Sequence, residues 1–381
     1  MPSFYQADLF RALLRTGKVD LRVIFTNKIP EDRAKLGWQD DLDGFEHEFL
    51  SEHRPIIDAI KKARRYRDHI HIVNGLWAGK TVEAVLLTLM YSGSKYFIYS
   101  EAPDPRSVVP PLEKKILMLV GKIIVRNAAG LLPISHFAVE YFRSYGAEES
   151  RIHPFGYFRS LPAGFHRTPN GQKKERVDII FVGQLVHRKG VDILLSAMEP
   201  LFTGHGNLYL QLIGSGELEE QLRDWVKERK LSHHITFEGA INPRQIMERI
   251  SEADLLVLPS RWDGWGLVVN EALMAGVPVL VSDMCGAADV VRDGINGYVF
   301  RSEDVQALRA KLKTFLELSD IRRLAEGSSS PGAFSRTAMA VAARKTGEAL
   351  DPENAAEYLV RVLKGGEIKS EEISKYPWIA T

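Results

Sequence analysis

Short runs of apolar residues alternate along this chain with longer segments in which apolar residues recur every three or four positions. The short runs are typical of buried β-strands, and the longer periodicity is typical of amphipathic α-helices. In the first half of the chain, strands are predicted at residues 20–25, 69–73, 95–100 and 130–134. Helices are predicted near residues 5–15, 54–66, 81–91, 111–127 and 136–145.

The second half shows the same alternation. Strands are predicted at residues 177–182, 208–213, 234–237, 255–258, 279–281 and 297–300. Helical periodicity is clear between them at residues 217–228 and 242–250. This repeated alternation of strands and helices predicts an α/β fold, in which helices cover both faces of parallel sheets.

Changes in composition divide the chain into three predicted parts. Residues 162–176 are rich in Pro, Gly, Asn and Lys, which is typical of a linker. We therefore expect an N-terminal domain at residues 1–160, a C-terminal domain at 161–345 and a closing helical region at 346–381. Residues 1–5 lead almost directly into a helix, whereas a doubly wound domain normally opens with a buried strand. The first strand of the N-terminal domain is thus predicted to be missing, with a truncated start as the simplest explanation.

Length and charge narrow the class of protein. The 381 residues are enough for two domains of ordinary size. A formal net charge of +1 argues against bulk nucleic-acid binding. Cys285 is the only cysteine, which excludes an intrachain disulfide and fits a reducing compartment. The sequence shows no secretory apolar region and no long membrane-spanning apolar run, so a cytoplasmic location is predicted.

Two carboxylates, Asp263 and Glu271, stand eight positions apart with glycines between them. The apolar run at 255–258 precedes this pair, and a helical segment begins between the two acids. The pair therefore lies where a predicted strand gives way to a helix N-terminus. In α/β proteins such a junction binds anions and ligand hydroxyl groups.

A second junction of this kind carries two adjacent cations. Arg188 and Lys189 precede Gly190 in a polar loop between the predicted strand at 177–182 and a helix start. Arginine offers a fork of donors, lysine a point charge, and the helix start backbone N–H groups, so the loop is predicted to bind a diphosphate. Further junctions of a strand with a glycine loop follow at residues 212–217 and 237–241.

These segments, in this order, closely resemble the retaining family-4 glycosyltransferases of the GT-B fold, the glycosyl transferases group 1. The resemblance covers residues 177–300 firmly and the first half by layout only. It implies two doubly wound, Rossmann-like domains that face a central cleft, with the C-terminal helix returning to the first domain. It also implies transfer of a sugar from a nucleotide diphosphate sugar, with UDP or GDP as the expected nucleotide, to an acceptor hydroxyl with retention at the anomeric carbon.

Carried over by position, the resemblance gives the two acids different roles. Glu271 is expected to bind the ribose hydroxyls, because a carboxylate accepts two hydrogen bonds from a vicinal diol. Asp263 is expected to face hydroxyls of the donor sugar. The family usually has a glutamate there, so the shorter aspartate leaves the identity of the sugar open. The alternatives are a helix-surface acid for Glu271 and a helix N-cap for Asp263.

The resemblance also implies contacts to the diphosphate and the base. Backbone N–H groups at the helix start are expected to contact the diphosphate, namely those of Gly266, Leu267 and Val268. Lys189 matches the family's phosphate-binding lysine, with a solvated loop cation as the alternative. The family's usual arginine after Gly183 is Gln184 here, so Arg188 is expected to supply that cation. Ile241 matches the position that contacts the base through its main chain.

The first half offers weaker candidates. Glu101 follows the predicted strand at 95–100 and is expected to contact the acceptor or the transferred sugar, with a turn-forming acid before proline as an equal alternative. Trp77 follows another strand and could stack on a sugar, although a core or lid position is the simpler interpretation. Asp41 and Asp43 match an Asp-x-Asp metal motif, but their surroundings indicate an acidic solvated loop. No metal and no cofactor are expected.

Two cationic segments raise the question of membrane contact. Residues 61–67 carry five cations, and residues 112–127 combine a strongly apolar sequence with three lysines and one arginine. Such a helix can rest on an anionic bilayer, whereas an ordinary packed helix with a solvated face is the alternative. Peripheral contact with the inner face of an anionic membrane therefore stands as a hypothesis.

The acceptor is expected to be a glycan, a lipid-linked molecule or a small molecule, as in the synthesis of cell-surface polysaccharide or glycolipid. Two other functions stay open at this point. A GT-B epimerase or phosphorylase would share the architecture without transferring a sugar to a separate acceptor. A nucleotide-sugar-binding protein would bind the donor without turnover.

Overall fold

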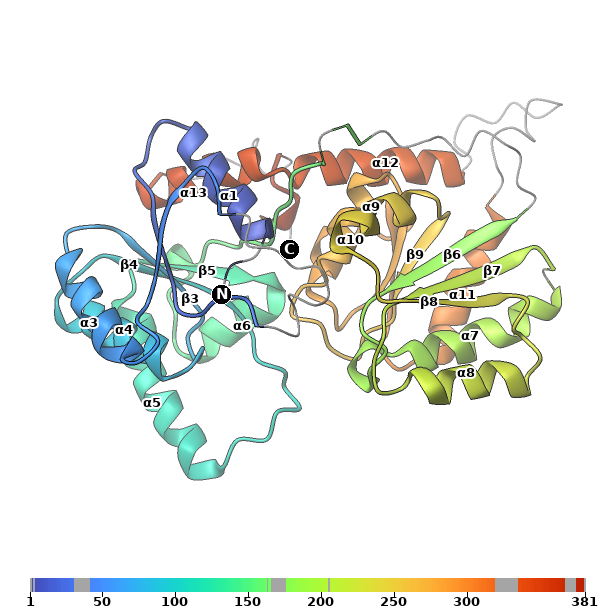
Figure 1. Ribbon diagram of the computed structural model, residues 1–381, viewed down its shortest axis with the longest axis horizontal. Helices are drawn as coiled ribbons and strands as arrows, with labels where there is room; N and C mark the ends of the chain where they lie inside the picture. Colours follow the sequence, from blue (N-terminus) through green and yellow to red (C-terminus); the bar gives the residue numbers. More distant parts are fainter. Residues whose placement is uncertain are drawn as a thin grey trace. The chain divides into compact units, whose positions relative to one another are not determined.

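Parallel β-sheets form the centres of two units in the computed structural model of this chain (Figure 1). The structure describes residues 2, 4–30, 42–162, 164–165, 176–204, 206–318, 335–366 and 375–379. Unit 1 takes its described residues from 1–159 and 352–381, and unit 2 takes its described residues from Ser160–Asp351.

Unit 2 contains a six-stranded sheet in which every pair of neighbouring strands is parallel. Its strands are β6 Val177–Val182, β7 Leu208–Ile213, β8 Ile235–Gly239, β9 Leu255–Leu258, β10 Val279–Ser282 and β11 Gly297–Phe300. Their order across the sheet is β8-β7-β6-β9-β10-β11. This is the order of a doubly wound dinucleotide-binding sheet, in which the chain first adds strands on one side of β6 and then on the other.

Helices cover both faces of this sheet. They are α7 Val191–Gly204, α8 Glu219–Glu228, α9 Pro243–Ser251, α10 Val268–Met274, α11 Val305–Glu317 and α12 Arg336–Ala349. Figure 1 shows α7, α8 and α11 on one face and α9, α10 and α12 on the other. Every residue of β6, β9 and β10 is buried, which explains why these strands are continuous apolar runs in the sequence.

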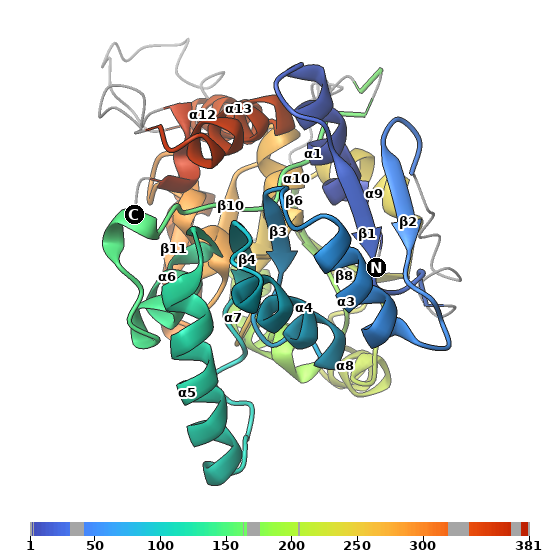
Figure 2. The ribbon, with the colours of Figure 1, turned by 90° about the vertical axis from the view of Figure 1, so that its left-hand side faces the viewer.

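Unit 1 contains two smaller parallel sheets. One pairs β1 Arg22–Phe25 with β2 Glu46–Phe49, and the other has the order β3-β4-β5, formed by His71–Asn74, Tyr96–Glu101 and Gly130–Ile134. The helices of this unit are α1 Phe4–Arg15, α3 Pro55–Arg65, α4 Lys80–Tyr91, α5 Pro111–Asn127, α6 Ser135–Ser144 and α13 Pro352–Leu363. Helix α4 packs against α3 and α5, as Figure 2 shows.

The C-terminal helix α13 packs against α1 within unit 1. Nε of Arg15 donates a hydrogen bond to the Glu353 carboxylate at 2.7 Å. Next to this helix lies a buried aromatic cluster, in which Phe155 stacks on Tyr358 and meets Trp378 edge-on. The closing segment of the chain therefore completes the core of unit 1.

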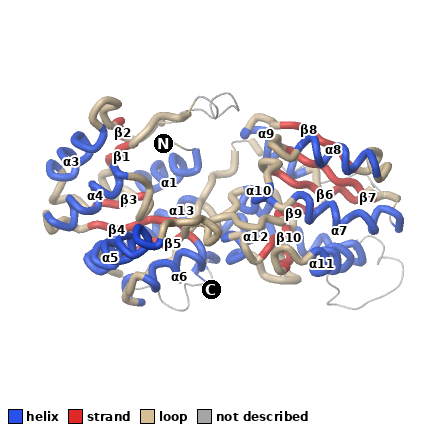
Figure 3. The backbone as a smooth tube through the Cα atoms, turned by 90° about the horizontal axis from the view of Figure 1, so that it is seen from below, coloured by secondary structure: helices blue, strands red, loops and turns tan. Residues whose placement is uncertain are grey.

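The predicted strands at 20–25, 95–100, 130–134 and 177–182 are confirmed to within two residues at each end, and the elements alternate as predicted. One strand was not predicted. Its sequence, Glu46-His47-Glu48-Phe49, lacks an apolar run because half of it is exposed. Figure 3 shows the strands of each unit between their helices. Within the described residues, no helix is both long and apolar enough to cross a membrane.

Candidate functional site

The strand order of unit 2 reverses between β6 and β9, which are hydrogen-bonded neighbours. The chain leaves β6 and β9 toward opposite sides of the sheet, so their carboxyl ends form a topological switch point. Open α/β sheets bind their ligands at this position. The loop after β6 carries Arg188 and Lys189, and the loop after β9 carries Asp263.

A close backbone approach holds these two loops together. Gly190 has φ +68°, and a Cβ atom there would lie 2.1 Å from the carbonyl oxygen of Pro259, so only glycine fits. The backbone N–H of Arg261 donates to the carbonyl of Arg188 at 2.8 Å. These contacts fix the residue before Gly190, which is Lys189, beside the loop after β9.

Lys189 and Asp263 form an ion pair at this switch point. Their side chains are only 14% and 12% exposed. Arg188 is more exposed, donates to the carbonyl of Trp262 at 2.9 Å and has Nη1 4.0 Å from the Asp263 carboxylate. The N-cap of α10 is Leu267, so Asp263 does not cap that helix. Lys189 is not a solvated loop cation either, because its side chain is largely buried. Both alternative interpretations of these residues, as a helix cap and as a solvated cation, are therefore wrong.

The loop that carries Asp263 is anchored on the loop after β10. The backbone N–H of Asp263 donates to the carbonyl of Met284, and the N–H of Gly286 donates back to the carbonyl of Asp263, both at 2.9 Å. Gly266 has φ +93°, and a Cβ atom there would lie 2.8 Å from Sγ of Cys285. Burial raises the pKa of Cys285, so its thiol stays protonated and acts as a packing group.

Glu271 lies in the first turn of α10 and is only 4% exposed, so it is not a helix-surface acid. Its neighbour Asn270 is also buried and accepts a hydrogen bond from the Trp265 indole at 2.9 Å. Leu267 and Val268 stand at the start of the same helix and are partly exposed. Their backbone contacts to a diphosphate, like that of Gly266, stay predictions.

The remaining candidates of unit 2 stand at the carboxyl ends of β6 and β8. Gly183 follows β6 directly and donates its N–H to the carbonyl of Ile213 at 2.9 Å. Gln184 comes next and is exposed. Ile241 lies two residues beyond the end of β8 and is partly buried. Contacts of these residues with a nucleotide stay predictions.

Arg261 is a site residue that the sequence patterns did not reveal. Its side chain is 10% exposed, and Nη1 and Nη2 donate to the two oxygens of Asp192 at 2.8 and 2.6 Å. It also donates to the carbonyl of His187 at 2.8 Å and to Glu303 at 2.9 Å. Arg261 thus holds the start of α7 and the loop after β6 against the loop after β9.

Two opposed effects act on the carboxyl group of Asp192. Burial alone would raise its pKa, but the hydrogen bonds and positive charge of Arg261 outweigh burial and hold that pKa below its ordinary value. The Arg261–Asp192 pair therefore stabilises the folded state at every pH above the ordinary carboxylate range. This stabilisation is lost only as the pH falls through the lowered pKa of Asp192.

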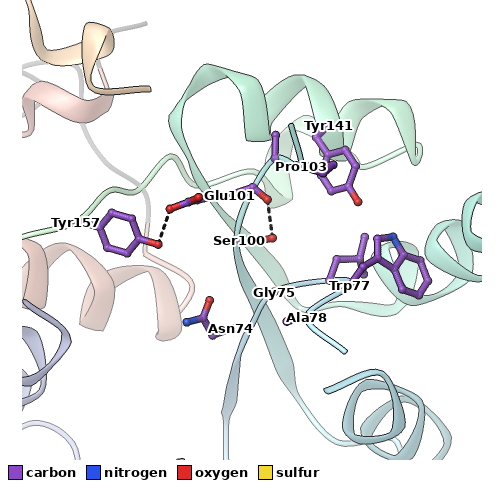
Figure 4. A pocket seen from close by; sticks show the side chains of 11 residues that line it. Asn74, Gly75, Trp77, Ala78, Ser100, Glu101, Pro103, Tyr141 and Tyr157 are labelled. Atoms are coloured by element: carbon purple, nitrogen blue, oxygen red, sulfur yellow. Dashed lines mark hydrogen bonds between the residues drawn. The ribbon is translucent and has the colours of Figure 1, made fainter. Parts of the chain in front are cut away.

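Unit 1 contains a pocket of about 310 Å³ at the carboxyl ends of β3 and β4 (Figure 4). Its polar side carries Glu101 and Asn74, and the Tyr157 hydroxyl donates a hydrogen bond to Oε1 of Glu101 at 2.7 Å. Trp77 and Tyr141 form an aromatic side. Hydroxyl-rich rings suit such a pocket, because a carboxylate and an amide bind hydroxyls while aromatic rings pack on apolar faces.

Tyr145 contacts both residues of the aromatic side of the pocket. The Trp77 indole donates to the Tyr145 hydroxyl at 3.0 Å, and the rings of Tyr141 and Tyr145 meet edge-on. Burial raises the pKa of Tyr141, so its hydroxyl stays neutral. Trp77 therefore lines the pocket and also packs against the hydrophobic core of unit 1.

The described residues contain no group of three or more His, Cys, Asp or Glu side chains placed to hold a metal ion. Asp41 of the Asp-x-Asp motif lies outside the described residues. The absence of a metal from the reaction stays a prediction.

Relatives of known sequence identify the family. A family model for glycosyl transferases group 1 matches residues 164–326. The uncharacterized glycosyltransferase MJ1178 of Methanocaldococcus jannaschii is 30% identical over 282 residues, which cover 70% of this chain and 77% of that protein. A second glycosyltransferase of that organism, MJ1607, is 33% identical over 133 residues, and the match spans 35% of this chain and 34% of its length. This chain belongs to the glycosyl transferases group 1.

A more distant relative has a stated activity. It is a GDP-mannose-dependent α-(1-6)-phosphatidylinositol monomannoside mannosyltransferase of Mycolicibacterium smegmatis, 24% identical over 351 residues that cover 80% of this chain and 90% of that protein. Among solved structures, a glycosyltransferase of Rickettsia africae has a TM-score of 0.69 at 15% identity and covers 94% of both chains. Anabaena HepE in complex with UDP has the same TM-score and identity, with 94% of this chain and 96% of that chain covered. The protein therefore has the GT-B fold, with two Rossmann-like domains.

Proposed function

We propose that the protein is a retaining glycosyltransferase that moves a sugar from a nucleoside diphosphate sugar to an acceptor hydroxyl. The observation that carries the proposal is the buried Lys189–Asp263 pair at the point where the strand order of unit 2 reverses. A lysine held there by a carboxylate, with Arg188 beside it, is an anion site that is organised before the ligand arrives. Family membership supports the same chemistry.

Charge develops on the departing diphosphate during the reaction. Lys189 and Arg188 would stabilise that charge, and because Lys189 is shielded from water its effect exceeds that of a surface cation. Glu271 would hold the ribose through its two oxygens, and Asp263 would bind hydroxyls of the donor sugar. The reaction is proposed to need no metal, since the cations take its electrostatic role.

The proposed step breaks the bond between the anomeric carbon and the phosphate oxygen and forms a bond from that carbon to the acceptor oxygen on the same face. The acceptor proton passes to the departing phosphate oxygen, so no protein nucleophile is required. UDP and GDP are the proposed nucleotides, supported by the UDP held by HepE and the GDP-mannose dependence of the mycobacterial relative. The shorter Asp263 in place of glutamate is the residue at which the sugar preference would be set.

The proposal is tested by incubating the protein with UDP- and GDP-sugars and a panel of glycan and lipid-linked acceptors. It predicts release of a nucleoside diphosphate together with a product of unchanged anomeric configuration, which NMR coupling constants report. Binding without turnover would instead indicate a nucleotide-sugar-binding protein, and an isomerised donor would indicate an epimerase. A cytoplasmic location belongs to the proposal and is supported by the single, buried cysteine.

Glu101 is proposed to act on the acceptor side. Glu101→Gln is expected to lower the transfer rate about tenfold or more, because it removes the charge that would orient an acceptor hydroxyl. Nucleoside diphosphate affinity is expected to stay unchanged. Tyr157→Phe removes the 2.7 Å hydrogen bond that holds Glu101 and is expected to raise the KM for the acceptor more than it lowers kcat. Equal loss of donor binding in both variants would refute this role.

Arg261→Lys tests the loop clamp of unit 2. Lysine keeps the charge but loses the paired hydrogen bonds to Asp192, so the loop that carries Lys189 is expected to shift. Transfer should fall about tenfold, with a raised KM for the donor. Arg309→Lys is the matched control, because Arg309 also ties two elements of unit 2 through its guanidinium. If both variants lose only thermal stability, Arg261 has no role in positioning Lys189.

A further inference from the structure

Helix α5 of unit 1 has an exposed apolar stripe along one side. Leu112, Ile116, Leu119 and Ile123 recur at helical spacing and are 72%, 54%, 64% and 47% exposed. Val108, just before the helix, is 96% exposed. One end of α5 extends beyond α3 and α4 in Figure 2, and residues 111–116 are all exposed, so that end is the N-terminal one. A contiguous surface of this kind marks a binding face.

Cations flank this stripe. At 100° per residue, Lys115, Lys122 and Arg126 project along one edge of it, and all three are exposed. The opposite side of the helix is buried against the rest of unit 1 and contains Gly121, Ile124 and Val125. The helix therefore has three distinct sides, which are a buried side, an apolar side and a basic edge.

From this arrangement we infer that α5 docks on an anionic bilayer surface. Apolar side chains of an interfacial helix enter the acyl boundary, and lysines beside them reach the headgroups with their long side chains. Anionic lipid supplies the negative charge that matches the basic edge. A second copy of the same face would not supply that negative charge, because α5 contains four cations and only one carboxylate, Glu113.

The pocket of unit 1 adjoins the buried side of the same helix. A Cβ atom at Gly121 would lie 3.0 Å from the Trp77 ring, so the aromatic wall of the pocket packs directly on α5. The pocket thus lies about one helix diameter, roughly 10 Å, from the apolar stripe. The inference deepens the proposed function, on which this step rests, by indicating an acceptor that is presented at a bilayer surface.

The basic run at 61–67 adds little to this surface. It lies at the end of α3, which α4 separates from α5. Lys62 in this run is half-buried and pairs with Glu48 at 2.5 Å, and Arg67 pairs with Asp68. The structure therefore places the membrane-binding surface on α5.

Co-sedimentation of the full-length protein with vesicles tests the inference. The vesicles are phosphatidylcholine with or without phosphatidylglycerol, at low and high salt. The wild type is expected to bind only the anionic vesicles, and less at high salt. Ile116→Glu with Leu119→Glu should lower the partition coefficient about tenfold or more. Ile295→Glu with Val341→Glu changes two equally exposed apolar residues of unit 2 and should have no effect.

A second pair of variants tests the basic edge. Lys115→Glu with Lys122→Glu should also abolish binding to anionic vesicles, whereas the control Lys227→Glu with Lys313→Glu, at exposed lysines of unit 2, should not. Equal binding of all variants, or no binding by the wild type, would overturn the inference. Dimers that Ile116→Glu dissociates, without vesicle binding, would show instead that the stripe pairs with a second copy. Because vesicle binding needs no donor, these results are independent of the transfer reaction.

Discussion

Lys189→Ala is expected to lower the transfer rate about 100- to 1,000-fold and to weaken nucleoside diphosphate binding at least tenfold. The magnitude is typical for the loss of one preorganised group that stabilises developing negative charge. Lys189 is 14% exposed, so its charge acts through a medium of lower dielectric than water. Steady-state kinetics and calorimetric titration of the diphosphate measure the two effects.

Because Asp263 is the ion-pair partner of Lys189, its substitution is expected to have a different effect on diphosphate affinity. Asp263→Asn should also lower the transfer rate, because it removes the carboxylate proposed to bind the donor sugar. Diphosphate affinity should stay the same or increase, since Lys189 no longer gives up a carboxylate partner when it binds phosphate. Diphosphate affinity that falls equally in the two variants would contradict this division of roles.

Loss of stability alone could imitate these results, because removing one partner leaves a poorly solvated charge behind. The double variant Lys189→Ala with Asp263→Asn separates the two effects. It removes both charges and should recover the thermal stability that Lys189→Ala loses. Its transfer rate should stay as low as that of Lys189→Ala, whereas recovery of the rate would show that Lys189 acts through folding only.

Glu271→Gln is expected to weaken nucleoside diphosphate binding about 10- to 100-fold, because hydrogen bonds to a charged group are worth about 1.5–3 kcal/mol each. Glutamine keeps the size of this buried side chain but loses the charge. The sharper test compares a ribonucleoside diphosphate with its 2′-deoxy form. The wild type should prefer the ribose form, and Glu271→Gln should lose that preference. A preference that persists unchanged would show that another group binds the ribose.

Much of the secondary structure could be predicted because local patterns determine it. The strands β6, β9 and β10 are buried on both faces, so their sequences are unbroken apolar runs. Strand β2 could not be predicted, because three of its four residues are polar and two of them, Glu46 and His47, are exposed. Its pairing with β1 also depends on residues 24 positions away. Strand order likewise depends on packing between distant segments.

The candidate site shows the same limit. Residue type and position at strand ends singled out Lys189 and Asp263 separately, but the ion pair joins residues 74 positions apart and follows from the approach of two loops. Arg261 gave no signal of its own, because its partner Asp192 lies 69 positions earlier. The hydrogen bond from Tyr157 to Glu101 spans 56 positions. Sequence patterns name candidate groups, and tertiary packing decides which of them act together.

Calorimetric titration of UDP and GDP is the most direct test of the central claim that unit 2 binds a nucleoside diphosphate at Lys189. The proteins compared are the wild type, Lys189→Ala and the control Lys227→Ala, which removes an exposed lysine of α8. The account predicts that at least one diphosphate binds the wild type and the control with equal affinity and binds Lys189→Ala at least about tenfold more weakly. Equal affinity in all three proteins, or no binding by the wild type, would contradict it.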